Sequence, residues 1–144
     1  MPAAYTAGFF IGEKMKKLIY RDDKIFENER MTYKLDGKYN VLRPSGKLVS
    51  RFKIKNLFSL RGKRQAVIGN LKIEKMKDQP ISEAKIINRQ MKLINHENEI
   101  SLIKEDEYLG SFDFENNTIE VAEDEGLVVS VFFALKNLEE KWKL

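Results

Sequence analysis

Gly126-Leu-Val-Val-Ser-Val-Phe-Phe-Ala-Leu135 is the longest apolar run in the chain, and it decides which folds the sequence can adopt. Acids at 123–125 precede the run, and lysines follow it from Lys136 onward. Carboxylates complement the positive N-terminal end of a helix dipole and ammonium groups complement its negative C-terminal end, so this arrangement predicts a helix over about 124–141. The valines leave a buried strand open as the alternative.

As a helix, the run has no polar face at its start, because apolar side chains recur all round its axis. A helix of this kind must be surrounded by the rest of the protein. The run is also too short to cross a bilayer, which takes roughly 20 apolar residues. We therefore expect a core helix, whose buried side chains include Leu127, Val128, Val131, Phe132 and Leu135.

Length and composition favour a single globular domain. The chain has 144 residues, of which 42% are apolar and 33% charged, a balance typical of globular proteins. It contains no cysteine and one histidine, which excludes disulfides and argues against the usual zinc sites; this composition is compatible with a cytoplasmic location. Residues 1–14 lack the basic start of a secretory signal, and we expect an N-terminal extension or a first strand there, followed by a single domain over 15–144.

Upstream of the apolar run, short alternating segments are separated by turn residues about every 8–12 residues. Asp36-Gly37 is typical of a two-residue hairpin turn, and Pro44-Ser45-Gly46 and Asn116-Asn117 are further turn signals. Roughly nine to eleven strands spaced in this way predict a mainly β, antiparallel barrel or sandwich. Two polar tracts, 21–30 and 82–89, leave short helices open as alternatives.

A β-rich domain can surround an apolar helix by closing its sheet into a barrel. The ending Glu123–Leu138, with its acids, aliphatic stretch and short polar tail, resembles the close of bacterial members of the tubby C-terminal-like superfamily, which includes the LURP-one-related proteins and the phospholipid scramblases. Asn56-Leu-Phe-Ser-Leu60 is similar to Phe-Ser segments that recur in that family. The resemblance implies a β-barrel with the helix inside it and a basic barrel surface that binds phosphoinositide head groups.

The segment 47–55 is the clearest strand, and one of its faces is basic. Its apolar members, Leu48, Phe52 and Ile54, alternate with cations, so one face points to the core. Cations two residues apart on a strand lie about 6–7 Å from each other, which suits a row of phosphates. With the loop that follows, the candidate anion-binding residues are Arg51, Lys53, Lys55, Arg61, Lys63 and Arg64.

Charge is distributed unevenly along the chain. Residues 37–73 contain ten cations and no acid, whereas 97–125 contain eleven acids and one cation. The leading hypothesis is a binding module for anionic lipid head groups or phosphorylated ligands, located in the cytoplasm or peripherally at a membrane. The alternatives are a regulatory module that binds a protein partner through the acidic half, a nucleic-acid binder, and solvated faces that bind nothing. Nucleic acid is the less favoured partner, because Phe52 points away from the cations and cannot stack on bases beside them.

Catalytic motifs give little support to an enzyme. His96 lies in the turn-like Asn95-His96-Glu97-Asn98, and no Ser-His-Asp spacing, glycine-rich phosphate loop or dinucleotide fingerprint occurs. We therefore predict a protein that is not an enzyme and needs no cofactor or metal. Trp142, in the polar tail, is expected to close one mouth of the barrel or to meet a partner.

Overall fold

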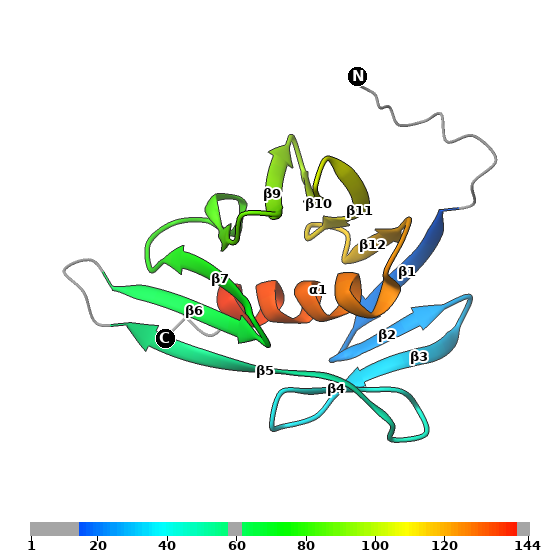
Figure 1. The fold of residues 1–144 in the computed structure, drawn as a ribbon. Helices are drawn as coiled ribbons and strands as arrows, with labels where there is room; N and C mark the ends of the chain where they lie inside the picture. The colour runs from blue at the N-terminus through cyan, green and yellow to red at the C-terminus, as the bar shows by residue number, and fades with distance from the viewer. Residues whose placement is uncertain (1–14, 58–61, 141–144) are drawn as a thin grey trace.

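The computed structural model describes residues 15–57 and 62–140. This part of the chain contains twelve strands, one short 3-10 helix and one α-helix (Figure 1). The 3-10 helix η2 (Ile81–Glu83) precedes β8, and α1 (Glu125–Glu140) follows all the strands. The strands are β1 (Lys16–Arg21), β2 (Lys24–Glu27), β3 (Arg30–Leu35), β4 (Asn40–Leu42), β5 (Leu48–Leu57), β6 (Lys63–Ile68), β7 (Leu71–Met76), β8 (Lys85–Ile87), β9 (Met91–His96), β10 (Glu99–Lys104), β11 (Glu107–Asp113) and β12 (Thr118–Val121).

All the strands belong to one antiparallel sheet, with the order β8-β7-β6-β5-β4-β3-β2-β1-β12-β11-β10-β9. The two halves of this meander are joined where β1 pairs with β12, in the register Lys16↔Val121 to Ile19↔Thr118. The sheet curls into a nearly closed barrel whose two edge strands are β8 and β9 (Figure 1). The prediction of a mainly β, antiparallel barrel with a C-terminal helix is therefore confirmed.

The helix α1 packs along the inside of the barrel (Figure 1). Every side chain from Val128 to Leu138 is buried, in whichever direction it leaves the helix axis. This explains why the run is apolar all round. Of the predicted core residues, Leu127 is partly buried against the same core. Those with no exposed surface are Val128, Val131, Phe132 and Leu135. Among the described residues, no helix has the length and apolarity that crossing a membrane requires.

Aromatic rings fix the position of α1 against the sheet. The centre of the Phe132 ring lies 5.3 Å from that of Tyr20, 5.8 Å from that of Phe112 and 5.2 Å from that of Phe114. Aromatic pairs at these separations contribute attraction beyond the burial of their area. Phe132 therefore connects the helix to β1 and to the end of β11 at the same point.

The N-terminal end of α1 is held by a charged side chain. The carboxylate of Glu125 accepts hydrogen bonds from Nζ of Lys16, at 2.7 Å, and from the hydroxyl of Tyr33, at 2.6 Å. Desolvation raises the pKa of Glu125, but the hydrogen bonds from Lys16 and Tyr33 outweigh it and leave the pKa below its ordinary value. The predicted acid at the helix start is thus a specific contact to β1 and β3.

Two of the hairpin turns are made of acids in the left-handed region. The φ angles are 53° and 61° at Asp22 and Asp23, and 49° and 67° at Glu105 and Asp106. Two consecutive positive φ angles are what a two-residue hairpin with the native strand twist requires. Aspartate tolerates this region better than most residues, which accounts for the first of these acidic pairs.

The prediction of a two-residue turn at Asp36-Gly37 is wrong. β3 ends at Leu35 and β4 begins at Asn40, so the loop has four residues. Oδ1 of Asp36 accepts hydrogen bonds from the backbone N–H groups of Lys38 and Asn40, at 2.8 and 2.9 Å. The Asp36 side chain thus accepts the backbone hydrogen bonds of a four-residue loop. A two-residue turn would not contain these N–H groups.

Two other expectations are corrected by the strands themselves. The tract 21–30 contains β2 between two hairpin turns and no helix, whereas 82–89 contains the end of η2 and then β8. Leu48 is 50% exposed, although it was expected in the core. The register between β4 and β5 shifts at this point, and Val49 packs against the core in place of Leu48.

Candidate anion-binding face

Strand β5 separates its cations from its apolar residues as the alternation predicts. Arg51, Lys53 and Lys55 are exposed, whereas Phe52 is buried and Ile54 partly buried. Nε of Arg51 donates a hydrogen bond to Oδ1 of the Asn40 side chain, at 2.6 Å, which orients the guanidinium along the surface. Three of the six predicted anion-binding residues therefore lie on one outward surface.

Neighbouring strands add cations to this surface, because paired residues of adjacent strands point to the same side of a sheet. Lys53 pairs with Val67 on β6, which pairs with Lys72 on β7. In the next row, the β7 residue Glu74 pairs with Lys85 on β8. We call the outer surface of β5–β8 the basic face. Its cations are Arg51, Lys53, Lys55, Lys63, Lys72 and Lys85.

Aliphatic side chains lie among these cations. Ile87 is 50% exposed and Leu57 is 37% exposed, and Val67 lies between Lys53 and Lys72 in the pairing register. Single exposed apolar side chains are common on protein surfaces, and Ile19, Leu48 and Ile94 are exposed elsewhere on this one. What distinguishes these strands is that their aliphatic side chains stand among cations. The basic face is thus amphipathic as well as positive.

One acid stands among the described outward residues of β5–β8. Glu74 accepts a hydrogen bond from Nε2 of Gln65, at 2.7 Å, and lies 3.3 Å from Nζ of Lys63. Lys63 therefore already has an ion-pair partner, Glu74, within the face. The exposed cations on β5, β7 and β8 outnumber this acid and make the surface potential positive.

Of the predicted members, Arg64 does not join the face. Arg64 is 6% exposed and points into the barrel, because it alternates on β6 with the outward Lys63 and Gln65. It pairs across the strands with Lys75, which is also buried, and desolvation lowers the pKa of both groups. Arg61 lies outside the described residues.

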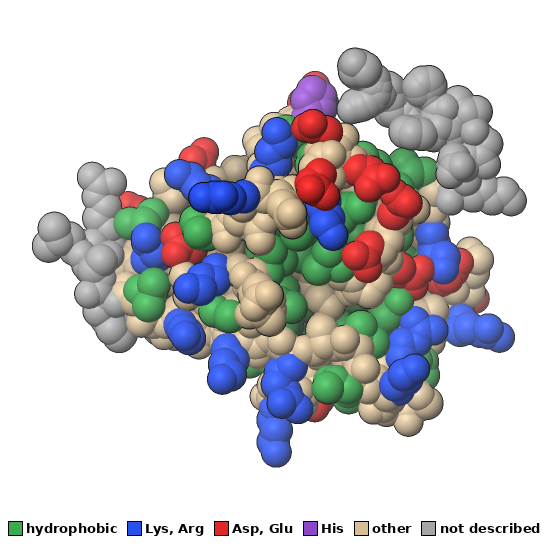
Figure 2. Space-filling model, viewed as in Figure 1, with side chains coloured by type: hydrophobic (Ala, Val, Ile, Leu, Met, Phe, Trp, Pro, Cys, Tyr) green, Lys and Arg blue, Asp and Glu red, His purple; other side chains and the backbone are tan. Residues whose placement is uncertain are grey.

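The acidic half of the chain occupies the other arc of the sheet. Glu99 on β10 pairs with Asp113 on β11, and Glu120 lies on the neighbouring strand β12. Desolvation raises the pKa of Glu99, and the charges of Glu120 and Asp113 raise it further. Figure 2 shows acidic side chains gathered where β10–β12 lie in Figure 1, and basic side chains on the side of β5–β7. Acids are therefore concentrated on a different arc of the sheet from the cations of the basic face.

The remaining candidates from the sequence contribute no site in the described chain. His96 is exposed at the end of β9, and over residues 15–57 and 62–140 no group of three His, Asp or Glu side chains is arranged to hold a metal. Trp142 lies outside the described residues. Lys72 and Lys85 were missed as members of the face, although the alternation of β7 already marked Lys72 as outward.

Comparison of the chain with protein-family models, with curated proteins and with solved structures found no match. The function is therefore argued from the geometry and chemistry of the chain itself.

Proposed function

We propose that this protein is a non-enzymatic, tubby-like module that binds anionic membrane surfaces through its basic face. The observation that carries the proposal is the exposure of Ile87 and Leu57 beside the cations of β5–β8. Lysine and arginine attract lipid phosphates, while aliphatic side chains gain from entering the boundary between head groups and acyl chains.

The architecture supports the family part of this proposal. A twelve-stranded barrel around an apolar C-terminal helix is the fold that the tubby-like resemblance of residues 123–138 implies. The same resemblance implies a basic barrel surface that recognises phosphoinositide head groups. Here the basic surface is the one formed by β5–β8.

The expected binding is reversible and sensitive to salt. Each lysine or arginine near an anionic membrane contributes about 1 kcal/mol, so the six cations of the face give several kcal/mol at most. Salt screens such charges over roughly 10 Å at 0.1 M. The exposed aliphatic surface adds roughly 25 cal/mol for each Å² that leaves water, and this part survives at high salt.

Lipid is favoured over nucleic acid by the apolar residues of the face. Single-stranded nucleic acids are held by aromatic side chains on which bases stack. Phe52 is 1% exposed and faces the barrel interior, and Ile87 and Leu57 have no aromatic ring. The described part of the basic face therefore offers phosphate contacts without a stacking platform.

Vesicle co-sedimentation tests the proposal. Wild-type protein should sediment with phosphatidylcholine vesicles that contain phosphatidylserine or phosphoinositides, and should remain in solution with phosphatidylcholine alone. The triple variant Arg51→Ala/Lys53→Ala/Lys55→Ala should lose most of this binding. The matched control is Lys24→Ala/Arg30→Ala/Lys38→Ala, which removes the same charge from exposed positions on β2, β3 and the β3–β4 loop.

Three outcomes would count against the proposal. If wild type and the β5 variant sediment equally, or if neither sediments, the basic face does not bind lipid. An equal loss in the two triple variants would reduce the effect to net charge. Retention by oligonucleotides but not by vesicles, at equal phosphate concentration, would make nucleic acid the ligand.

A further inference from the structure

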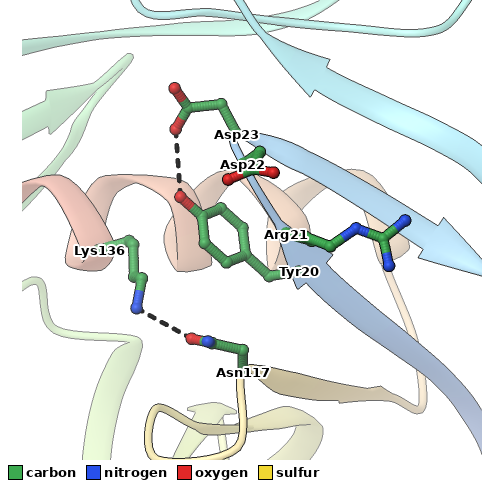
Figure 3. A pocket seen from close by; sticks show the side chains of 6 residues that line it. All are labelled: Tyr20, Arg21, Asp22, Asp23, Asn117 and Lys136. Carbon is green, nitrogen blue, oxygen red and sulfur yellow. Dashed lines mark hydrogen bonds between the residues drawn. The ribbon is translucent and has the colours of Figure 1, made fainter.

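A pocket of about 440 Å³ is lined by residues of β1, of two turns and of α1 (Figure 3). It lies where the β1–β2 turn and the β11–β12 turn approach the helix. The residues that line it are Tyr20, Arg21, Asp22, Asp23, Asn117 and Lys136.

Lys136 supplies a fixed positive charge at one side of the pocket. Its side chain is largely buried, and Nζ donates a hydrogen bond to Oδ1 of Asn117, at 2.9 Å. Nζ also lies 5.2 Å from the centre of the Tyr20 ring and 5.9 Å from that of Phe114. An ammonium held between an amide and two aromatic faces cannot swing freely into solvent. Lys136 follows the apolar run and lies within α1, as the predicted helix over about 124–141 implies, and it lines the pocket.

Two carboxylates supply the opposite charge on the other side. Asp22 and Asp23 form the positive-φ turn between β1 and β2, and Oδ1 of Asp23 accepts a hydrogen bond from the hydroxyl of Tyr20, at 3.1 Å. Figure 3 shows the ring of Tyr20 between this pair of aspartates and the pair formed by Lys136 and Asn117. The pocket therefore has a cationic side at Lys136 and an anionic side at Asp22 and Asp23, with the ring of Tyr20 between them; Arg21 is a second cation in its lining.

We propose that this pocket binds a small dipolar molecule that carries an amino group at one end and a carboxylate or phosphate at the other. The acidic group of the ligand meets Lys136 and the amide of Asn117, and its amino group meets Asp22 and Asp23. Charges on adjacent carbons, as in an α-amino acid, are too close together to reach both ends. The pocket suits ω-amino acids such as δ-aminovalerate, whose charged groups are separated by several methylene groups.

Isothermal titration with defined probes tests this assignment. δ-Aminovalerate should bind. Valerate and n-pentylamine, which each carry one of the two charges, should have affinities at least about tenfold lower. O-phosphoethanolamine tests whether a phosphate replaces the carboxylate. Lys136→Gln and Asp22→Asn should each weaken δ-aminovalerate about tenfold or more, while vesicle binding through the basic face stays unchanged.

Matched variants keep the test specific. Asp106→Asn makes the same change in a second positive-φ turn, between β10 and β11, and Lys92→Gln removes an exposed charge from β9. Both should bind δ-aminovalerate as wild type does. Amide NMR of the wild-type protein gives a readout without mutation, and δ-aminovalerate should shift the resonances of Asp22, Asp23 and Asn117 and leave those of β5–β8 in place.

The proposal is overturned if δ-aminovalerate gives neither heat nor shifts at millimolar concentrations, or if valerate binds as tightly. It is also overturned if Asp22→Asn binds like Asp106→Asn. Because Asp22 is an exposed turn residue, this comparison decides the question even where Lys136→Gln fails to fold.

Discussion

Gly110, on β11, marks the place where a strand and the central helix come closest. A Cβ atom at this position would lie 2.5 Å from the backbone oxygen of Glu120 on β12 and 3.0 Å from Cγ1 of Val128 on α1. The first of these contacts is with backbone, which cannot rotate away. The residue is glycine because the barrel wall and the helix leave no volume for any side chain.

Gly110→Ala should therefore destabilise the protein by about 1–3 kcal/mol, the usual cost of overpacking a core. A urea titration followed by circular dichroism measures the change. Gly37→Ala is the control, since nothing lies within 4 Å of the Cβ it would add. Equal midpoints for the two variants would show that the space around Gly110 adjusts without cost.

The contacts of Glu125 make stability depend on pH. Its pKa is lower in the folded protein than its ordinary value of 4.5, because the hydrogen bonds from Lys16 and Tyr33 outweigh desolvation. The unfolded chain therefore binds the proton more readily, so the carboxylate stabilises the fold above that value and this contribution is lost as the pH falls through the folded pKa.

Glu125→Gln should lower the urea midpoint at neutral pH and have a smaller effect at about pH 3, where the wild-type carboxylate is largely protonated. The exposed turn residue Glu29 offers the comparison, and Glu29→Gln should leave the midpoint unchanged at both values. A loss for Glu125→Gln that is the same at both pH values would assign the effect to packing instead of charge.

At the scale of the element, α1 acts as the core that the barrel wall closes around. Phe132→Asp should unfold the domain, because a buried carboxylate without a partner costs several kcal/mol against a total stability of about 5–15 kcal/mol. The circular dichroism spectrum and its thermal transition report the loss. The control is Ile94→Asp, on the outer side of β9, where the side chain is 44% exposed. This variant should keep the wild-type spectrum and thermal transition.

A Phe132→Asp protein that stays folded and stops sedimenting with vesicles would contradict this architecture, since α1 would then be an exposed anchor.

Sequence patterns located the elements where the pattern is local. The series of short strands was predicted from apolar alternation between turn residues, and the helix was recognised from its charges and apolar run. The wide loop at Asp36 and the outward turn of Leu48 were missed, because a side-chain hydrogen bond and a bulge against β4 decide them. Neither the side-chain hydrogen bond nor the bulge can be recognised from the sequence pattern of the strand that it affects.

The candidate sites divide in the same way. Exposure of Arg51, Lys53 and Lys55 could be read from alternation within β5, but the burial of Arg64 depends on where β6 begins. The approach of β7 and β8 to β5 depends on pairing between strands. The pocket at Lys136 joins segments more than ninety residues apart in sequence, and no spacing rule connects them.

For the molecule as a whole, separation of charge matters more than net charge. The formal charge is +4, yet acids are gathered on the surface of β10–β12. At low ionic strength and neutral pH we expect retention on both a cation exchanger and an anion exchanger. The triple variant Glu99→Gln/Asp113→Asn/Glu120→Gln should no longer be retained on the anion exchanger and should still be retained on the cation exchanger. Free passage of wild type through the anion exchanger would show that the acidic surface is too weak to act alone.

The position of α1 after every described strand also sets the order of events during synthesis. The ribosome makes β1–β12 before it makes the helix that they enclose, and β1 must wait for β12 before its second edge is paired. Until then the inner strand faces have no apolar partner, and contacts so distant in sequence form slowly. We expect folding to wait until α1 has left the ribosome, with chaperones covering the inner faces of the strands until the helix is in place.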